Sequence, residues 1–334
     1  MNRSFAALLA LVLTVLLSVP CSAQTPSCVL QQYASLDMHF RPDGTFTVPV
    51  KIGGSDRNMM VDIGAMTSSV SSSLAGELKL VPAPLRPKRL YLFYFGKLIT
   101  STVKVPSIRV GTASIGDLDV FLIPDKGAVA DLDGKGMPDG VDGILGADVL
   151  RKVDLEFDFK SRKLNVFSQD HCTGIGVVYW ADAAAALPFT PGVLSSLKID
   201  MQLDGKHVVV VPSTMEVGTT MAMVTARLLL GIKPTSAGVT VTARNPDGTP
   251  DVFRYGFRSL TAAGISFADP QIDLLSDHDS SPLVTRPESM PMGNYVPLYT
   301  EGDISLGLKE LERLRLFFAF KDNALYATDR DAHK

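Results

Sequence analysis

One aspartate stands where an apolar stretch gives way to small and hydroxylated residues, in the sequence MVDIGAMTSSVS at residues 60–71. The apolar residues up to Val61 predict the end of a strand, and Gly64 permits a sharp turn directly after Asp62. A strand and turn of this kind would hold one carboxylate in a fixed position, as acid–base chemistry on a bound water requires. Aspartate and glycine are also ordinary turn residues, so the alternative is a polar strand end without a catalytic role.

A long block of the first half recurs in the second half. Residues 144–167 align without gaps with residues 305–328, and the alignment matches Gly146 with Gly307 and several apolar positions. Self-similarity at this distance is typical of an internal duplication. We therefore expect two homologous lobes.

The stretch around Asp62 has a counterpart as well. Residues 62–74 align with residues 216–228, which pairs Asp62 with Glu216. Counting from the glycine turn before each strand pairs Asp62 with Ser213 instead. We prefer the pairing with Glu216 because apolar positions further along also match, but both alignments remain open.

The elements that must position these residues are mostly strands, since short β-branched or aromatic runs alternate with Gly, Pro, Asp and Asn. The two turns are each followed by a short helical pattern, at 71–78 and 222–231. The fold class expected is therefore all-β, β-rich with a few short helices. The expected strands are 45–52, 89–95, 100–110, 117–123, 154–167, 197–203, 207–212 and 314–328.

Each half resembles a retropepsin-type aspartic peptidase subunit, and the two halves together resemble a pepsin-like, two-lobed enzyme in one chain. The family pattern is an apolar strand, then D-[TS]-G-[AS], a Ser/Thr-rich turn, a short helix and a later apolar-apolar-Gly strand. Residues 61–71 and 142–150 follow this pattern, and 216–220 with 304–314 follow it less closely. The resemblance implies two homologous acid-protease-like β-barrel lobes with a cleft between them.

The resemblance also implies a site. Two carboxyls, Asp62 from the first lobe and Glu216 from the second, would share and activate one water molecule. Two departures from the family bear on this pair: Ile63 replaces a Thr or Ser that hydrogen-bonds across to the other lobe, and Glu216 is one methylene longer than Asp. The substrate-binding residues expected from the resemblance are Gly64, Ala65, Tyr94, Gly218 and Thr219.

Two further segments invite a functional interpretation. Family members close a β-hairpin flap over the substrate, and residues 90–98 and 241–257 are the candidates, with ordinary surface hairpins as the alternative. Residues 131–142 hold acids and a glycine at some positions of a calcium loop, but Lys135 occupies a ligand position, so a solvated loop is expected. The only tryptophan, Trp180, is expected to pack in the core between the lobes.

The N-terminus predicts export. Residues 1–23 read as a signal peptide, with a transmembrane or lipid anchor as the disfavoured alternatives. The mature chain would then comprise an N-terminal lobe at 24–178 and a diverged C-terminal lobe at 179–334, in the periplasm or outside the cell. Cys28 and Cys172 remain after cleavage and are expected to form a disulfide, the alternative being two unrelated thiols.

Composition excludes several function classes. The formal net charge of −3 gives no basic surface for nucleic acid, and the five histidines are scattered, so neither a metal site nor a cofactor is expected. The sequence predicts a monomeric, exported aspartic-type endopeptidase that hydrolyses peptide or protein substrates with a carboxylate-activated water, without a membrane span after signal removal. The alternative is an inactive relative that binds peptide or another envelope component.

Overall fold

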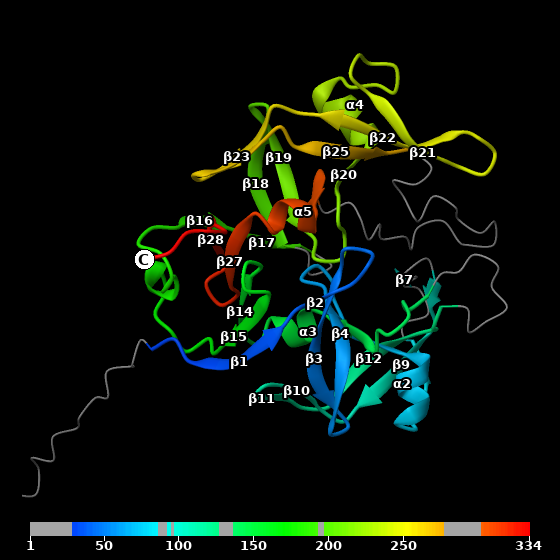
Figure 1. Cartoon of the computed structure of the whole chain (residues 1–334). Coiled ribbons are helices and arrows are strands. Elements are labelled where there is room, and N and C mark those ends of the chain that lie inside the picture. Colours follow the sequence, from blue (N-terminus) through cyan, green and yellow to red (C-terminus); the bar gives the residue numbers. More distant parts are fainter. Residues whose placement is uncertain (1–28, 86–91, 95–96, 127–135, 193–196, 277–301) are drawn as a thin grey trace, which may run out of the picture.

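The chain folds into two large β-sheets, one for each half of the sequence, joined by a smaller sheet (Figure 1). The computed structural model describes residues 29–85, 92–94, 97–126, 136–192, 197–276 and 302–334. It confirms an all-β, two-lobed, acid-protease-like fold with short helices.

The first large sheet has ten strands. Its spatial order is β11 (Ala113–Ile115), β10 (Ile108–Val110), β3 (Phe46–Ile52), β4 (Ser55–Val61), β13 (Gly143–Leu145), β5 (Ser69–Ser71), β12 (Leu118–Ile123), β9 (Ser101–Val105) and β6 (Ala83–Pro84), and β2 (His39–Phe40) pairs with β3.

The second large sheet also has ten strands and repeats this order. Read from the corresponding edge, it comprises β24 (Ile265–Ala268), β23 (Ser259–Ala262), β18 (Leu197–Leu203), β19 (Lys206–Pro212), β26 (Ile304–Leu306), β20 (Thr219–Ala222), β25 (Gln271–Leu275), β22 (Pro250–Gly256) and β21 (Thr240–Arg244), and β17 (Thr190–Pro191) pairs with β18.

The two orders match strand for strand. In each sheet a parallel pair, β4 with β13 or β19 with β26, lies at the centre, and the inner strand is also antiparallel to β5 or β20. This shared topology is the structural counterpart of the sequence repeat, and it fixes which residues of the two halves are equivalent.

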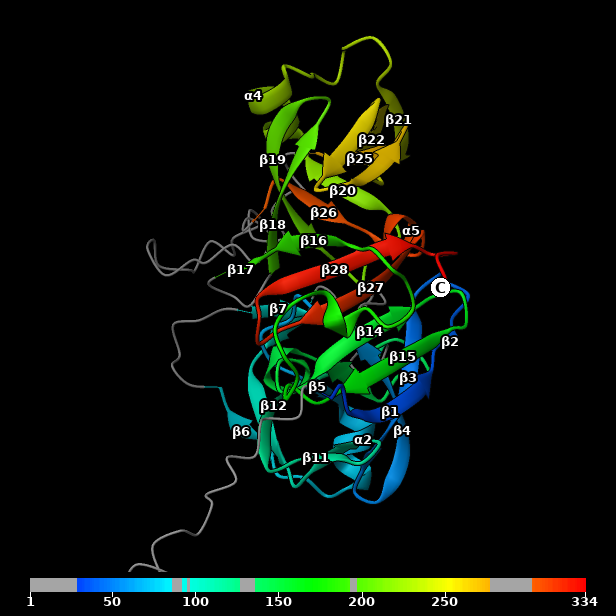
Figure 2. The ribbon, with the colours of Figure 1, turned by 90° about the vertical axis from the view of Figure 1, so that its left-hand side faces the viewer.

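A six-stranded sheet lies between the two large sheets (Figure 2). Its central strands, β14 (Asp154–Asp158) and β27 (Leu314–Ala319), come from different halves and pair antiparallel, with Leu155 opposite Phe318 and Phe157 opposite Leu316. The outer strands complete the order: β1 (Gln32–Asp37), β15 (Lys163–Phe167), β14, β27, β28 (Ala324–Asp329) and β16 (Ala185–Pro188). Backbone hydrogen bonds therefore join the halves at this sheet.

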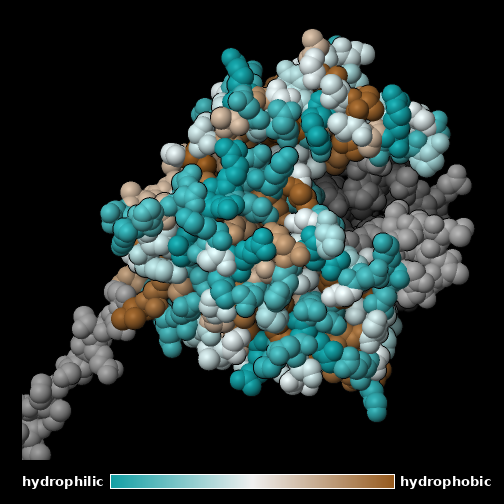
Figure 3. All heavy atoms as spheres, in the orientation of Figure 1, coloured by the Kyte–Doolittle hydropathy of each residue, from teal (hydrophilic) through white to brown (hydrophobic). Residues whose placement is uncertain are grey.

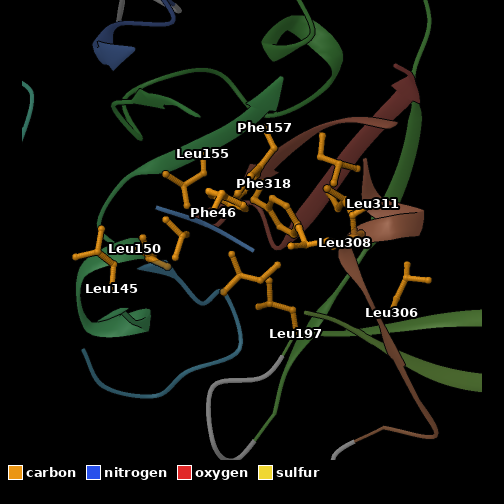
Figure 4. Close-up of a cluster of buried hydrophobic side chains, with 14 of the residues drawn as sticks. Phe46, Leu145, Leu150, Leu155, Phe157, Leu197, Leu306, Leu308, Leu311 and Phe318 are labelled. Atoms are coloured by element: carbon orange, nitrogen blue, oxygen red, sulfur yellow. The ribbon is translucent and has the colours of Figure 1, made fainter. Parts of the chain in front are cut away.

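Buried apolar side chains continue across the junction (Figure 4). The rings of Phe157 and Phe318 meet edge to face with centroids 5.6 Å apart, and Phe46 of the first large sheet lies 6.4 Å from Phe157. All three side chains are almost completely buried. Burying a phenylalanine stabilises a fold by about 1.5–3 kcal/mol, so this cluster helps to hold the two halves in one arrangement.

The helices are short and follow the turns, as predicted. The expected helix at 71–78 is α2 (Ser72–Glu77), whose first turn is capped where Leu74 donates its amide to the Ser71 hydroxyl at 3.1 Å. The expected helix at 222–231 is α4 (Met223–Leu230), which ends at Gly231 in the left-handed conformation. The remaining helices are α3 (Ala147–Leu150), α5 (Leu308–Leu311) and the 3₁₀ turn η1 (Ile175–Val177).

The segment between β15 and β16 packs against the six-stranded sheet. Trp180 is 6% exposed and contacts Phe317 of the second half, which confirms its predicted place in the core between the lobes. Beside it, Arg315 donates to the buried Glu156 at 2.6 Å and lies over the Trp180 ring. This ion pair joins β27 to β14. The predicted domain boundary at 178/179 falls within the same segment and stays a prediction.

A second polar contact ties this segment to both halves. His171 hydrogen-bonds to the buried Asp154 of β14, and the other oxygen of Asp154 accepts the amide of Phe320 at 2.9 Å. Burial is the largest single influence and works to lower the pKa of His171, but the hydrogen bonds to Asp154 and to the Cys172 carbonyl, with the negative charges of Asp154 and Asp322, together outweigh it, so the pKa of His171 is raised. Burial also acts on Asp154, whose pKa it raises. Burial alone would therefore leave both side chains uncharged. Because several donors converge on the Asp154 oxygens, we favour the charged pair.

Both predicted hairpins are present. Strands β7 (Leu92–Tyr94) and β8 (Lys97–Ile99) pair in the first half, and β21 pairs with β22 in the second. Their closure over a substrate stays a prediction. Polar side chains cover most of the face seen in Figure 3. Across the described parts of the chain, none of the helices has the length and apolar character to cross a membrane.

Candidate active site

Asp62 lies in a loop whose backbone is fixed by the neighbouring strand. Its amide donates to the carbonyl of Leu145 at 3.0 Å, which extends the β4–β13 pairing past the end of β4. One carboxylate oxygen accepts the amide of Gly64 at 2.9 Å. Asp62 as a residue remains partly exposed. The loop thus presents a carboxylate in one orientation and stabilises its charge with a backbone donor.

Gly146 locks this loop from the side. A Cβ at Gly146 would lie 2.7 Å from the backbone of Thr67, so any larger residue would displace the loop. The Gly146 amide donates to the Ser68 hydroxyl at 2.8 Å, and the amide of Ala147 donates to the carbonyl of Ala65 at 2.7 Å. Gly146 therefore allows its strand end to pack closely against the Asp62 loop.

The second half contains the same loop, and its contacts identify the residue equivalent to Asp62. The amide of Ser213 donates to the carbonyl of Leu306 at 2.9 Å, as the amide of Asp62 does to Leu145. Strands β19 and β26 pair Pro212 with Leu306, as β4 and β13 pair Val61 with Leu145. Ser213 is therefore the counterpart of Asp62.

This register corrects the preferred sequence alignment. Glu216 corresponds to Ala65, because the carbonyl of Glu216 accepts an amide from Leu308 as that of Ala65 does from Ala147. Met215 correspondingly takes the place of Gly64. The alignment of Asp62 with Glu216 is wrong by three residues, and the alternative alignment through Ser213 is correct.

Thr214 connects the two loops. Its hydroxyl donates to the carbonyl of Val61 at 2.6 Å and accepts the amide of Ile63 at 3.3 Å, so it bridges the residues on either side of Asp62. Thr214 is 3% exposed, and its equivalent in the first half is Ile63, which has no hydroxyl to return the contact. The cross-lobe hydrogen bonds expected of the family are thus made by the Thr214 side chain of the second half and not by the Ile63 side chain of the first half.

Glu216 nevertheless belongs to the same site as Asp62. One of its carboxyl oxygens accepts the Thr220 hydroxyl at 3.1 Å, and Ser305 provides a second side-chain hydrogen bond. Burial is the main cause that raises the pKa of Glu216, and the negative charge of Asp62 raises it further, while the two hydroxyls act in the opposite direction. The charge of Asp62 therefore acts on the second predicted carboxyl, that of Glu216.

The predicted substrate-binding residues fall into three groups. Gly64 and Ala65 lie in the Asp62 loop, and Gly218 and Thr219 lie in the equivalent loop of the second half. Thr219 is buried and its hydroxyl accepts the Gly307 amide at 3.2 Å, so the observed contact fixes the loop. Tyr94 belongs to β7, but its side chain lies outside the described structure. Their binding roles stay predictions.

Three residues of the site were not chosen from the sequence: Thr214, Thr220 and Ser305. Ser213 entered only through the alternative alignment, and the signal for Ser213 and Thr214 was the Ser-Thr pair that directly follows the apolar run ending at Pro212. No signal marked the other two, because hydroxyl side chains are common at strand positions.

Other predicted features lie wholly or partly outside the described residues. These are the signal segment 1–23, Cys28 and hence its pairing with Cys172, and the loop at 131–142 up to residue 135. Within the described ranges, no group of three or more His, Cys, Asp or Glu side chains could hold a metal ion.

Comparison with known proteins agrees with the geometry of the first lobe. Residues 48–149 match the family model described as aspartyl protease, which confirms the predicted resemblance. No curated protein sequence matches the chain. Two similar solved structures are conglutin gamma, a basic 7S globulin from lupine seeds, and basic 7S globulin from soybean, each 9% identical.

The alignment with the lupine structure covers 90% of this chain and 95% of the lupine chain, with a TM-score of 0.46. The alignment with the soybean structure covers 91% of this chain and 96% of the soybean chain, with a TM-score of 0.47. At these identities and scores, neither likeness bears on activity.

Proposed function

We propose, from the aspartyl protease match of residues 48–149 and the loop that holds Asp62, that this chain is an aspartic-type endopeptidase. The observation that carries the proposal is that the negative charge of Asp62, from the first half, acts on the carboxyl of Glu216, from the second half, and helps to raise its pKa. Two carboxyls that interact electrostatically do not ionise together readily, so one can keep its proton while the other acts as a base.

The environments of the two carboxyls assign their roles. Asp62 accepts the Gly64 amide, which favours its ionised form, whereas burial favours the protonated form of Glu216. In the first step, Asp62 takes a proton from water, the oxygen bonds to the peptide carbonyl carbon, and Glu216 gives its proton to the carbonyl oxygen. In the second, Glu216 recovers a proton from the resulting diol, Asp62 protonates the amide nitrogen, and the C–N bond breaks. Both carboxyls return to their starting states.

The substrate would be an extended peptide lying between the two hairpins, β7–β8 and β21–β22. An extended backbone exposes the carbonyl to be attacked and can pair with strand edges. We further propose that the protein is exported and acts as a monomer in the periplasm or outside the cell, with a disulfide between Cys28 and Cys172, and that it needs no cofactor.

One observation favours the alternative, a protein that binds peptide or another envelope component without cleaving it. Ser213 occupies the position equivalent to Asp62 and carries no carboxyl. Glu216 reaches the site from a position three residues further along, and displacement of a catalytic group by about 1 Å can cost roughly a hundredfold in rate.

The deciding experiment is hydrolysis of a denatured protein and a peptide library across acid to neutral pH, with matched variants. Asp62→Asn and Glu216→Gln remove the charge and proton of each carboxyl while keeping its size, and each should lower kcat at least about a hundredfold. Asp117→Asn, a change at an exposed carboxyl that pairs with Lys104, is the control and should retain activity.

Ser213→Asp distinguishes the two functions. It would place a carboxyl at the position equivalent to Asp62, with Ser213→Asn as its uncharged control. If the natural protein is inactive and only Ser213→Asp cleaves, the second lobe has lost its catalytic carboxyl and the peptidase proposal is wrong.

A further inference from the structure

The carboxyl of Glu216 is held by two side chains from different strands of the second half. Thr220 lies on β20 and Ser305 on the neighbouring β26, and these two residues pair directly in the sheet. Their side chains both hydrogen-bond to Glu216. Two hydroxyl side chains from two strands therefore converge on one carboxyl.

The first half lacks this arrangement at the equivalent positions. Strands β5 and β13 pair Ser69 with Ile144, as β20 and β26 pair Thr220 with Ser305. The position of Glu216 is occupied there by Ala65, so one hydroxyl and the carboxyl are both missing. The second half thus contains a matched set of polar side chains that the duplication alone does not explain.

The hydroxyls at Glu216 differ in kind from the backbone amide of Gly64, which donates to Asp62. An amide can only donate, so it suits an ionised oxygen. A hydroxyl can donate to a carboxylate or accept from a protonated carboxyl, so Thr220 and Ser305 can remain bonded to Glu216 in both states. A residue that must release and recover a proton in each cycle needs partners of the second kind.

We propose that Thr220 and Ser305 are positioning residues that hold Glu216 as the proton-carrying member of an unequal pair, with Asp62 as the fixed base. This inference rests on the proposed peptidase function. On this inference the two carboxyls have different roles and cannot exchange them. The hydroxyls that hold Glu216, and so influence its protonation, both belong to the second lobe.

The charged surroundings of Glu216 support this assignment. The charge that faces it is Asp62, which disfavours ionisation of Glu216. On the adjacent strand β25, Asp273 approaches the loop at Gly218, but Arg254 of β22 pairs with it at 2.7 Å. The two hydroxyls are thus the groups that favour the ionised form, and their removal should raise the pKa of Glu216.

The test measures that pKa directly, by NMR titration of the protein with ¹³C-labelled glutamate carboxyls. Glu216→Gln identifies the Glu216 signal by its disappearance. Thr220→Val, which keeps the shape and removes the hydroxyl, should raise the pKa of Glu216 by about one unit, and Ser305→Ala should act in the same direction. Thr220→Ser should restore the natural value, and Ser69→Ala, the change at the equivalent first-half hydroxyl, should leave it unaltered.

The pH dependence of kcat/KM in the same variants provides a second test. The limb of the kcat/KM profile that falls with rising pH reports the group that must be protonated, so it should move upward in Thr220→Val and Ser305→Ala by the shift that NMR measures. Ser69→Ala should not move it.

Three results would overturn the inference: no shift of the Glu216 pKa in Thr220→Val and Ser305→Ala, an equal shift in Ser69→Ala, or movement of the opposite limb of the profile. The NMR arm needs no turnover. If the natural protein cleaves nothing, the proposed function fails, whereas an unshifted Glu216 pKa in an active enzyme defeats only the roles assigned to Thr220 and Ser305.

Discussion

Thr214→Val should destabilise the protein through the two backbone groups that the Thr214 hydroxyl satisfies. Valine matches threonine in shape, so the change creates little empty space and mainly removes the hydroxyl. The Val61 carbonyl, bonded at 2.6 Å, and the Ile63 amide, bonded at 3.3 Å, would then be buried without that partner. Each such group costs about 1–3 kcal/mol, with the longer contact at the low end, so the free energy of unfolding should fall by about 2–4 kcal/mol.

Urea denaturation followed by circular dichroism measures this loss, with Thr214→Ser as the control that retains the hydroxyl. The control removes one methyl group from a buried position and should cost about 1 kcal/mol. The same variants should separate in hydrolysis, because the lost contacts flank Asp62. If Thr214→Val and Thr214→Ser unfold at the same urea concentration, the hydroxyl does not connect the lobes as described and the reasoning is refuted.

Two further predictions concern the sheet between the lobes. Glu156→Ala should lower the free energy of unfolding by about 3–5 kcal/mol because it leaves Arg315 partly buried without its main partner, whereas Asp56→Ala, at the exposed ion pair with Lys51, should leave the urea midpoint nearly unchanged; equal effects would contradict the buried-pair argument. The raised pKa of His171 means that its contact with Asp154 stabilises the fold fully below about pH 6.5 and is lost as pH rises through the folded-state pKa. Urea midpoints at a series of pH values should show this decline in the natural protein and not in His171→Gln, and parallel curves would argue against it.

Local patterns were enough to predict much of the fold. The strand expected at 197–203 is β18 at the same bounds, and the expected hairpins and helices differ from the observed ones by only a few residues at their ends. Strand β4, which leads into the Asp62 loop, was predicted only at its apolar end, because its first residues, Ser55 to Asn58, are polar and lie largely exposed. Propensity marks buried strands well and exposed strand ends poorly.

The site was predicted less well, and the reason is specific. The preferred alignment matched Gly64 with Gly218 and Leu74 with Leu228, but Leu74 is buried and Leu228 is 76% exposed. A turn accepts glycine at several positions, so one matched glycine does not fix a register. Strand pairing does, because each residue has one partner across the sheet, and this information is absent from a single sequence.

The pairing of β14 with β27 has a consequence for how this protein could change during evolution. Leu155 meets Phe318 while Phe157 meets Leu316, so the junction is self-complementary, as in a symmetric dimer of one lobe. In such a dimer one gene encodes both subunits, so every substitution occurs in both half-sites at once. Fusion of two copies removes that constraint, and one half could acquire Ser213 and Glu216 while the other kept Asp62. The covalent link thus allowed the two-fold symmetry to be broken at the place where the carboxyls meet.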